Sequence, residues 1–237
     1  MIRNTANTAN LCIIPARGGS KRIPRKNIKP FLGKPIIAYS IEAAMKSNLF
    51  DEVMVSTDDN EIAEIAREHG AKVPFFRTGE NANDFATLAD VIDEVKNQYL
   101  ELERSFENIC CILPTAPLLT VDNLRKGYEL LVSKKADSVR PVVRFYYPIQ
   151  RAVKLYDNGK VSMFYPEYQN TRSQDLEPTY HDAGQFYWMK FEAGLKGINK
   201  FGFEIPNTLV QDIDNEEDWI MAEIKFKYLK TENNMIK

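Results

Sequence analysis

The sequence predicts an α/β fold, a doubly wound and mostly parallel sheet with a small β appendage. Two observations lead to this prediction. Up to about Arg144, short apolar runs alternate with segments of helical periodicity, a pattern typical of parallel strands joined by right-handed crossovers. Beyond Arg144 this alternation stops and aromatic residues become frequent, which indicates a separate small element.

The elements of the main domain follow one another in a regular order. Short apolar runs predict strands at residues 11–14, 53–56, 73–76, 109–113, 138–143, 184–189 and 209–212. Helical periodicity predicts helices at residues 35–44, 86–102, 121–133 and 215–229, with one more between residues 59 and 70. Asp58 or Asp59 can cap the helix between residues 59 and 70, and Gly70 can end it.

The predicted fold also indicates where a ligand binds. In open α/β sheets, ligands bind beyond the carboxyl ends of the strands. The loops that start at Pro15, Thr57, Arg77 and Pro114 should therefore border the site.

Residues 144–182 are expected to form the appendage. Asp157-Asn158-Gly159 is a turn signal between two short strand-like runs, so this segment should contain a β-hairpin. Residues 1–10 are polar and rich in Asn and Thr, and are expected to be a flexible tail. Residues 11–230 then form a single α/β domain.

Composition excludes several classes of protein. Apolar residues make up 44% and charged residues 27% of the 237-residue chain, as in an average soluble domain. Its apolar runs are too short to cross a bilayer, and it has no secretory signal pattern. The three cysteines, Cys12, Cys110 and Cys111, lie in apolar runs and are expected to be buried reduced thiols. We therefore expect a cytoplasmic protein with no membrane partner.

The segment that follows the first predicted strand is strongly basic. Between Pro15 and Glu42 it has no acidic residue and seven basic ones, namely Arg17, Lys21, Arg22, Arg25, Lys26, Lys29 and Lys34. Such a run can be a nucleic-acid arm, a solvated face or an anion site. Because it follows a buried strand and contains Gly18 and Gly19, we favour a compact anion site and expect no nucleic-acid partner.

The chemistry of this basic loop suits a triphosphate. Its spacing fits neither the P-loop nor the dinucleotide fingerprint. Backbone N–H groups at Gly18 and Gly19 can turn toward phosphate, Arg17 offers a fork to its oxygens, and Lys21 and Lys26 supply mobile charges. A solvated basic loop is the alternative.

Several motifs of the chain resemble one family. Ala16-Arg17-x-x-Ser20-Lys21 followed by Lys26-Asn27 is similar to the nucleotide loop of the CMP-sugar synthetases, which are the sialate, ketodeoxyoctonate and pseudaminate cytidylyltransferases. The resemblance spans residues 11–230 and implies a nucleotidyltransferase-like Rossmann fold. Further landmarks recur in order, namely Val55–Asp58, Arg77 with Asp84 and Thr87, Pro114-Thr115-x-Pro117, Thr171-Arg172-x-Gln174 and Asp212-Ile213-Asp214.

The resemblance implies a reaction and a nucleotide site. CTP would react with a nine-carbon acidic sugar, a nonulosonic acid, to give the CMP-sugar and pyrophosphate. The residues that would bind the nucleotide are Arg17, Gly18, Ser20, Lys21, Lys26, Asn27, Arg77, Pro114 and Thr115, of which Arg17 and Lys21 would also act in catalysis. Arg77 could instead form a salt bridge at the rim, and Asn27 could be a turn residue. Leu113 stands where sialate enzymes have a Gln near cytosine, so the base must be read by other groups.

Asp212 and Asp214 are the predicted metal ligands. They lie two residues apart at a predicted strand end, so both side chains should project from one face. Two adjacent carboxylates suit a hard cation, and the resemblance assigns them to Mg²⁺ and to catalysis. Alternatively, Asp214 and Glu217 could cap the last helix.

The resemblance also implies a sugar site and its specificity. Residues 147–151 and 170–188 look most like the pseudaminate branch. Ala183-Gly184 replaces the Asn-Gly of sialate enzymes, and Tyr180, Phe186 and Trp188 would suit a less polar sugar if they face it, which predicts pseudaminic acid. Alternatively, Ala183 is only strand packing. The residues that would bind the sugar are Gln150, Arg151, Arg172, Gln174, Tyr180, His181 and Gln185.

Some alternatives remain open at this stage. His181 could be a general base, a hydrogen-bond partner of the sugar or a structural residue. The chain could be a sialate cytidylyltransferase, a transferase that uses UTP or GTP, or a nucleotide-binding relative without turnover. We expect a homodimer formed through residues 144–182, because this segment is too small to bury its own apolar surface.

Overall fold

The computed structural model describes residues 9–235, and its centre is a seven-stranded sheet. The strands lie in the order β11-β6-β10-β5-β1-β4, and β9 pairs with β6. Their bounds are β1 Asn10–Pro15, β4 Glu52–Ser56, β5 Asn108–Ile112, β6 Ser138–Arg144, β9 Tyr180–Asp182, β10 Phe186–Lys190 and β11 Lys200–Glu204. β1 begins at Asn10, the last residue of the predicted tail. The rest of that tail, residues 1–8, lies outside the described residues.

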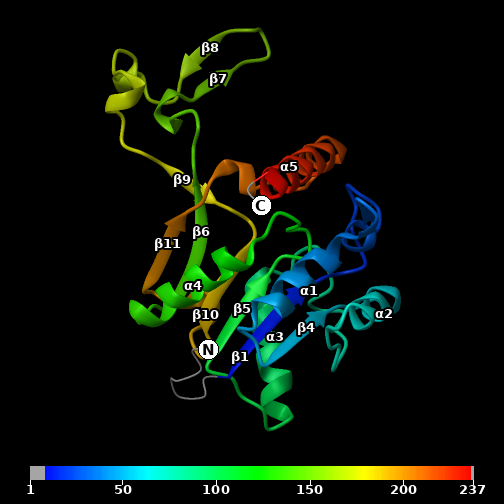
Figure 1. Cartoon of the computed structure of the whole chain (residues 1–237). Coiled ribbons are helices and arrows are strands. Elements are labelled where there is room, and N and C mark those ends of the chain that lie inside the picture. The colour runs from blue at the N-terminus through cyan, green and yellow to red at the C-terminus, as the bar shows by residue number, and fades with distance from the viewer. Residues whose placement is uncertain (1–8, 236–237) are drawn as a thin grey trace.

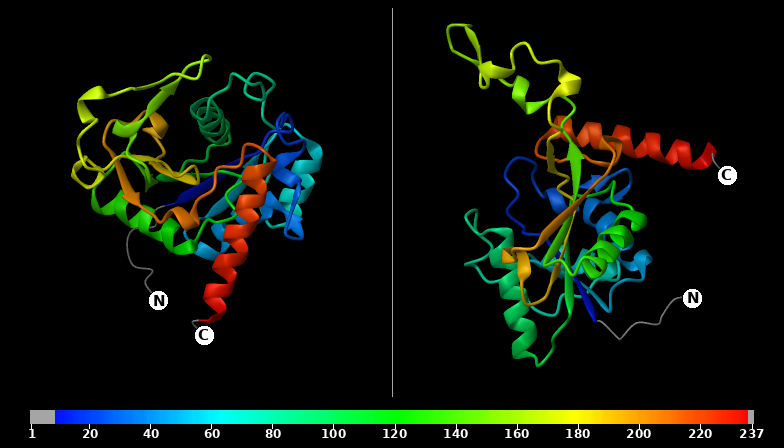
Figure 2. Two further views of the ribbon diagram at one scale, coloured as in Figure 1. Left: turned by 90° about the horizontal axis from the view of Figure 1, so that it is seen from above. Right: turned by 90° about the vertical axis from the view of Figure 1, so that its left-hand side faces the viewer.

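Helices cover both faces of this sheet, as predicted for a doubly wound fold (Figures 1 and 2). Side chains of α1, α2 and α4 pack on one face, and those of α3 pack on the other. α5 packs beside the small β2–β3 ladder. The bounds are α1 Ile36–Ser47, α2 Asn60–Glu68, α3 Leu88–Glu101, α4 Val121–Ser133 and α5 Glu216–Met235, with β2 at Pro30–Phe31 and β3 at Lys34–Pro35.

The sheet is mixed rather than mostly parallel. β4, β1 and β5 are parallel to one another, and β11 is parallel to β6. β10 lies between β5 and β6 and is antiparallel to both. The chain reaches β10 through the appendage and β9 rather than through a helical crossover, so nothing forces a parallel pairing there. Two of the strands, β9 and β11, have no counterpart among those predicted from the sequence.

The signals at the helix ends behave as the sequence indicates. Asp59 is the cap of α2, and its Oδ1 accepts the N–H of Ile62 at 3.0 Å. Gly70 has a φ of 91°, the left-handed region that glycine adopts without a steric cost. Thr87 and Asp90 form a reciprocal capping box at the start of α3.

Two predicted strands are wrong, each for a local reason. At residues 73–76, Lys72 alone forms a bridge, to Met54, and Pro74 follows without an N–H for a ladder. Residues 209–212 form no strand within the described chain, because side chains rather than a neighbouring strand satisfy their carbonyl groups. Gln185 Nε2 donates to the oxygen of Leu209 at 2.6 Å, and Lys225 Nζ donates to that of Val210 at 2.6 Å.

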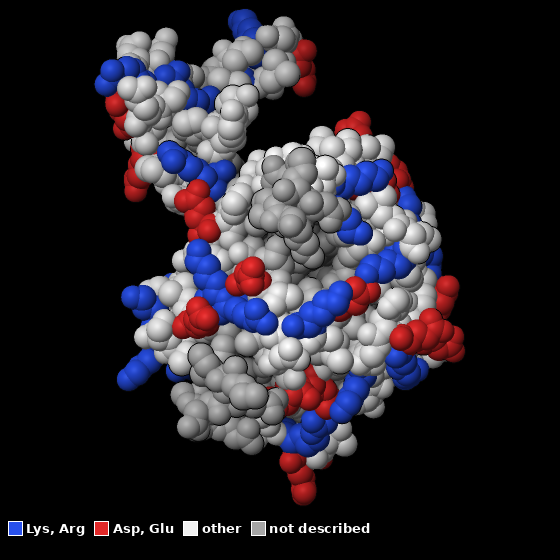
Figure 3. All heavy atoms as spheres, viewed as in Figure 1, with Lys and Arg blue, Asp and Glu red and all other residues white. Residues whose placement is uncertain are grey.

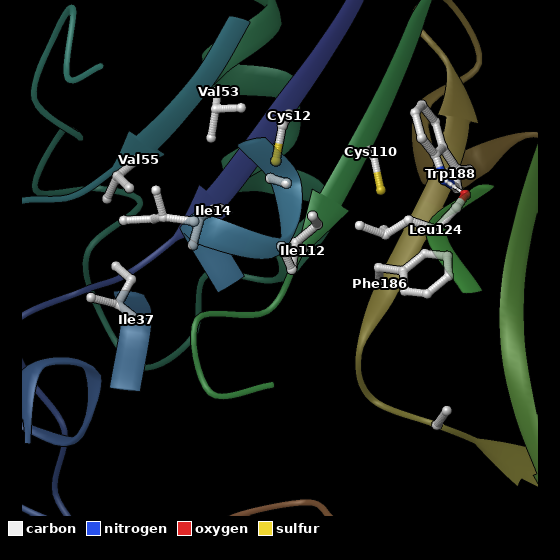
Figure 4. Packing of buried hydrophobic residues seen from close by; sticks show 14 of the residues in the cluster. Cys12, Ile14, Ile37, Val53, Val55, Cys110, Ile112, Leu124, Phe186 and Trp188 are labelled. Atoms are coloured by element: carbon white, nitrogen blue, oxygen red, sulfur yellow. Dashed lines mark hydrogen bonds between the residues drawn. The ribbon is translucent and has the colours of Figure 1, made fainter. Parts of the chain in front are cut away.

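Two predicted sugar-facing aromatics lie in the core instead. Phe186 and Trp188 are both 0% exposed and pack against α4 (Figure 4). The indole Nε1 of Trp188 donates to the carbonyl of Leu124 at 3.0 Å. Ala183 is 2% exposed in the same core cluster, so the alternative of strand packing is the correct interpretation of this residue. These three side chains do not line a sugar pocket.

The appendage projects from the main domain as a separate lobe (Figures 1 and 3). It contains the predicted hairpin, with β7 at Val153–Leu155 paired to β8 at Val161–Met163. Large apolar side chains remain exposed on it, including Tyr146 at 84% and Leu155 at 76%. Among the described helices, none is long and apolar enough to cross a membrane.

Candidate active site

A cleft of about 520 Å³ lies at the carboxyl ends of β1 and β5. Its walls come from the loop after β1, from Arg77, from residues 81, 83, 84, 86–88 and 91, and from residues 113–115. Eight of the nine predicted nucleotide residues line it, namely Arg17, Ser20, Lys21, Lys26, Asn27, Arg77, Pro114 and Thr115. The predicted cluster of phosphate-binding cations is therefore a single surface.

Gly18, the ninth, does not line the cleft and has a different use. Its N–H donates to Asp58 Oδ1 at 2.9 Å, so this amide is not directed at a phosphate. A Cβ on Gly18 would lie 2.7 Å from Asp59 Oδ2, closer than packed atoms approach. The assignment of Gly18 to nucleotide binding stays a prediction, and the structure shows a packing reason for glycine here, its close approach to the α2 cap.

Asn27 and Arg77 hold the loops that form the cleft. Asn27 is 6% exposed, and its Nδ2 donates to the carbonyl of Arg17 at 2.9 Å, which fixes the start of the basic loop. Arg77 is 8% exposed and donates to Ser56 Oγ at 3.1 Å and to the Ser56 carbonyl at 2.6 Å. Burial lowers the pKa of Arg77, and the carboxylate of Asp58 opposes this. Arg77 thus lines the cleft from a buried position rather than forming a salt bridge at the rim.

The two predicted catalytic cations share one carboxylate. Arg17 Nη1 lies 2.9 Å from Asp84 Oδ1, and Lys21 Nζ pairs with Asp84 Oδ2. The same Nη1 of Arg17 donates to the carbonyl of Asn83 at 2.9 Å. The positive charge predicted from the basic run is therefore present at the cleft, and it is already paired with the carboxylate of Asp84.

The basic loop and the acidic pair meet in space although about 190 residues separate them. Lys26 Nζ donates to the carbonyl of Ile213 at 2.5 Å and lies 3.9 Å from Asp214 Oδ1. Arg22 Nη2 lies 2.8 Å from the same Asp214 oxygen. Burial lowers the pKa of Lys26, although Asp214 and Asp212 oppose this. Lys26 and Arg22 thus connect the basic loop to the segment that carries the acidic pair.

Asp214 does not cap the last helix. Asn215 and Asp218 form that cap: Asp218 Oδ2 accepts the N–H of Asn215 at 3.1 Å, and Asn215 Oδ1 accepts the N–H of Asp218 at 3.0 Å. Asp214 is half-buried and Asp212 exposed, on either side of the fully buried Ile213. The expected alternation of side chains therefore exists without the expected strand. Neither carboxylate is used as the helix cap, but Asp214 Oδ1 is paired with Arg22 and lies near Lys26.

Leu113 stands where sialate enzymes have a Gln near cytosine, and its backbone groups are already hydrogen-bonded within the protein. Leu113 lines the cleft, its N–H donates to the carbonyl of Gln185 at 2.8 Å, and its carbonyl accepts from Ser40 Oγ at 2.8 Å. Gln185 is 3% exposed, and its Oε1 has no hydrogen-bond partner among the described residues. Gln185 directly precedes β10 and meets Leu113 through its main-chain carbonyl, while its side-chain Nε2 donates to the carbonyl of Leu209.

The predicted sugar residues do not gather in this cleft within one chain. Of the seven, Gln174 lines a different cleft of about 480 Å³ at the base of the appendage, and none lines the nucleotide cleft described above. Arg172 pairs with Asp175 at 2.7 Å, and Gln150 donates to the Glu177 carbonyl at 3.1 Å, both inside the appendage. Arg151 likewise donates to a carbonyl of the appendage.

Tyr180 and His181 lie on β9, between the appendage and the main sheet. Tyr180 is 43% exposed. His181 is exposed, with its Nδ1 2.8 Å from the Asp182 carbonyl and its ring against Phe145 at 4.9 Å between centroids. Neither side chain contacts the nucleotide cleft, so one chain alone gives His181 no proton to abstract there.

Residues that the sequence interpretation gave no role also form part of this site. Asp84 was noted as a landmark of the family resemblance, and Arg22 belongs to the basic run, but neither was assigned a function. Asn83 carried no signal at all. Their positions depend on the folding of residues 78–87 against the basic loop, which no local pattern encodes.

A cleft at the carboxyl ends of parallel strands, lined by cations, is typical of nucleotide-binding α/β proteins. The family model for cytidylyltransferases matches residues 11–234, and the chain belongs to this family. A pseudaminic acid cytidylyltransferase of Campylobacter jejuni is 45% identical over 92% of this chain and 96% of its own length. An N-acylneuraminate cytidylyltransferase A of Danio rerio is 37% identical over 91% of this chain and 51% of its own length.

The fold has a counterpart among solved structures. A CMP:2-keto-3-deoxy-manno-octonic acid synthetase, solved in complex with CTP, superimposes with a TM-score of 0.69. The superposition covers 94% of this chain and 100% of the other, at 16% sequence identity. At that identity the match supports the α/β fold alone.

Proposed function

We propose that this chain transfers CMP from CTP to pseudaminic acid and releases pyrophosphate. The observation that carries the chemistry is the cleft lined by Arg17, Lys21 and Lys26, the last of which also contacts Ile213 and Asp214. The choice of sugar is supported by the Campylobacter jejuni relative, which matches nearly the whole chain. Ala183 gives no support for the choice of sugar, because its side chain is buried in the core.

The reaction forms one bond and breaks one. The anomeric hydroxyl oxygen of the sugar attacks the α-phosphorus of CTP and loses its proton, while the bond from this phosphorus to the β-phosphate oxygen breaks and pyrophosphate leaves. Little covalent work falls to the protein, so catalysis is mainly positioning and stabilisation of charge. Arg17 and Lys21 would neutralise the charge that develops on the leaving group. Lys26, half-buried between the cleft and Ile213, would keep the phosphates near the acidic pair.

The acidic pair fits a hard cation in the proposed mechanism. Asp212 and Asp214 offer carboxylate oxygens, the ligands that Mg²⁺ prefers, and Asp214 is not used as a cap. Among the described residues there is no group of three or more acidic, His or Cys side chains that could hold a metal, so phosphate and water oxygens would complete the shell. When bound, Mg²⁺ would withdraw charge from the phosphate oxygens.

We further propose that the active protein is a homodimer. The appendage carries the predicted sugar residues away from its own nucleotide cleft, and it exposes apolar surface that a second copy can cover. The partner's appendage would then bring a sugar-binding surface to this cleft.

The three cysteines are buried free thiols, which supports a location in the reducing cytoplasm.

One competition experiment tests the proposed substrate. Equal concentrations of pseudaminic acid and N-acetylneuraminic acid are incubated with CTP and Mg²⁺, and both CMP-sugars are quantified. We expect CMP-pseudaminic acid to predominate. Preferential formation of CMP-N-acetylneuraminic acid would make the chain a sialate enzyme. Pyrophosphate release with UTP or GTP but not CTP would contradict the proposed nucleotide, and CTP binding without turnover would contradict an enzymatic role.

A further inference from the structure

The loop of residues 78–87 is held at both ends and crosses the rim of the nucleotide cleft. At its start, Arg77 is fixed to Ser56, and the N–H of Thr78 donates to Glu94 Oε1 at 2.7 Å. At its end, Thr87 is fixed by the capping box of α3. The residues between these anchors form a strap that is not part of the sheet.

In the middle of this strap, one turn directs a carboxylate into the cleft. Asn83 Oδ1 accepts the N–H groups of Phe85 at 2.7 Å and Ala86 at 3.0 Å. Asn83 and Asp84 line the cleft, whereas Phe85 is 93% exposed. The turn is thus a compact unit that presents Asp84 to the basic loop.

The contacts of Asp84 are those that a phosphate group would make. Its two oxygens pair separately with Arg17 and with Lys21, the two cations assigned to the triphosphate. The hydrogen bond from Lys21 and the neighbouring charge of Arg17 lower the pKa of Asp84, so it is an anion at neutral pH. Arg17 Nη1 also donates to the Asn83 carbonyl at 2.9 Å, so one edge of the guanidinium is occupied by the strap.

A carboxylate and a triphosphate cannot both keep these cations. Both are anions attracted to Arg17 Nη1 and Lys21 Nζ, and like charges a few ångströms apart repel. We propose that Asp84 occupies a phosphate position in the unliganded protein and is displaced when the triphosphate binds. Asp84 is then a positioning residue: it keeps Arg17 and Lys21 directed into the cleft until CTP arrives, and it competes with CTP for them.

This inference rests on the proposed function, because it takes the anion to be the triphosphate of CTP. It predicts a specific division between binding and turnover. Removing the charge of Asp84 should strengthen CTP binding, because nothing has to be displaced, while the groups that act at the transition state stay in place. The affinity gain should depend on Arg17, since that is one of the two cations that Asp84 holds.

The test compares Asp84→Asn with the wild-type chain by calorimetry, using CTP and inorganic tripolyphosphate as separate ligands. We expect the Kd of both to fall about three- to tenfold in Asp84→Asn, the scale of two exposed ion pairs. The KM for CTP should fall with it while kcat stays within about twofold. Asp84→Glu should restore wild-type affinity. Glu80→Gln, a matched control on the same exposed loop, should leave the Kd unchanged.

A further variant links the effect to its cause. In an Arg17→Ala background, the gain from Asp84→Asn should shrink, because Asp84 then holds Lys21 alone. Unchanged or weaker binding of tripolyphosphate by Asp84→Asn would overturn the inference, and so would an equal gain in Glu80→Gln. Failure of CTP turnover in the wild-type chain would instead contradict the proposed function, since the tripolyphosphate comparison does not require turnover.

Discussion

The nucleotide cleft and the appendage are organised in opposite ways. In the cleft, cationic side chains from the basic loop meet partners from distant parts of the chain, such as Arg22 with Asp214 and Lys21 with Asp84. In the appendage, the predicted sugar residues contact their own neighbours, as Arg172 does with Asp175 three residues later. The cleft is therefore built from contacts between residues distant in sequence. The appendage is built from contacts within its own segment, and part of its apolar surface is exposed.

This difference indicates how much of the site one chain supplies. The cleft is lined by eight of nine predicted nucleotide residues and needs only its substrate. The appendage exposes Tyr146 at 84%, Tyr147 at 79% and Leu155 at 76%, an apolar surface that a small hairpin cannot bury by itself. Under the proposed function, one chain supplies the nucleotide half of the site, and the proposed dimer would supply a second surface for the sugar half.

Removing Asp212 or Asp214, the predicted metal ligands, should have the largest effect. Asp212→Ala or Asp214→Ala should lower kcat by about a thousandfold or more, because charge on the phosphates would no longer be neutralised at the transition state. Pyrophosphate release measures this, and Mn²⁺ binding followed by paramagnetic resonance should weaken in the same variants. Glu217→Ala, an exposed acid on α5, serves as the control. Near wild-type pyrophosphate release in both aspartate variants would end the assignment.

Arg17 should come next. Arg17→Ala removes a charge-assisted contact to the triphosphate and should lower kcat/KM for CTP by about tenfold to a hundredfold. Arg17→Lys should restore activity only in part, because a lysine lacks the planar fork of the guanidinium. Steady-state kinetics with varied CTP measures both variants. If Arg17→Ala has the CTP kinetics of the wild-type chain, the basic loop is only a solvated face.

The helices were predicted well because the signals that define them, caps and helical periodicity, are local in the sequence. α4 spans residues 121–133 as predicted, because Thr120 provides a cap and the apolar positions repeat with helical spacing. The strand predicted at residues 209–212 is absent, because an apolar run does not show which groups will hydrogen-bond to its backbone. There, the side-chain amide of Gln185 and the ammonium of Lys225 donate to the backbone carbonyls in place of a neighbouring strand.

The site was predictable where its residues are adjacent in sequence. Four cations of the basic run line the cleft because one loop places them together, namely Arg17, Lys21, Arg22 and Lys26. Arg77 comes from another loop, and Lys29 and Lys34 of the run pair with Glu216 and Glu42 instead. The ion pairs of Asp84 with Arg17 and Lys21 join residues more than sixty positions apart, and only the tertiary structure brings these residues into contact. Phe186 and Trp188 were misassigned since strand alternation does not show which face of a sheet borders a ligand.

The appendage should produce a smaller effect that is confined to the sugar. We expect the wild-type chain to sediment as a dimer at micromolar concentration. Tyr146→Asp with Leu155→Asp should sediment as a monomer, and its KM for the sugar acid should rise about tenfold or more while CTP binding persists. Ile198→Asp, at a site on the main domain that is 94% exposed, is the matched control. A fully active wild-type monomer would contradict the dimer.

The smallest effect on turnover should come from Glu52, at the opposite end of β4 from the cleft. Its side chain is 1% exposed and accepts from Arg104 Nη2 at 2.8 Å and Lys72 Nζ at 2.9 Å, with Tyr99 as a third donor. Burial opposes ionisation of Glu52, but these three donors outweigh it and lower its pKa. A carboxylate with a lowered pKa in the folded state stabilises the fold above its unfolded value, and this contribution is lost as the pH falls through the folded pKa.

Glu52→Gln should therefore lower the free energy of unfolding by about 2–4 kcal/mol at pH 7, and the difference from wild type should shrink as the pH falls below about 4.5, the ordinary value for Glu. Urea unfolding at several pH values measures this, while the KM for CTP should stay unchanged because the cleft is distant. Glu42→Gln is the matched control: Glu42 also pairs with two lysines, Lys34 and Lys46, but its side chain is 32% exposed. It should cost about 1 kcal/mol or less. Equal losses in both variants would mean that burial of the Glu52 network adds nothing to the fold.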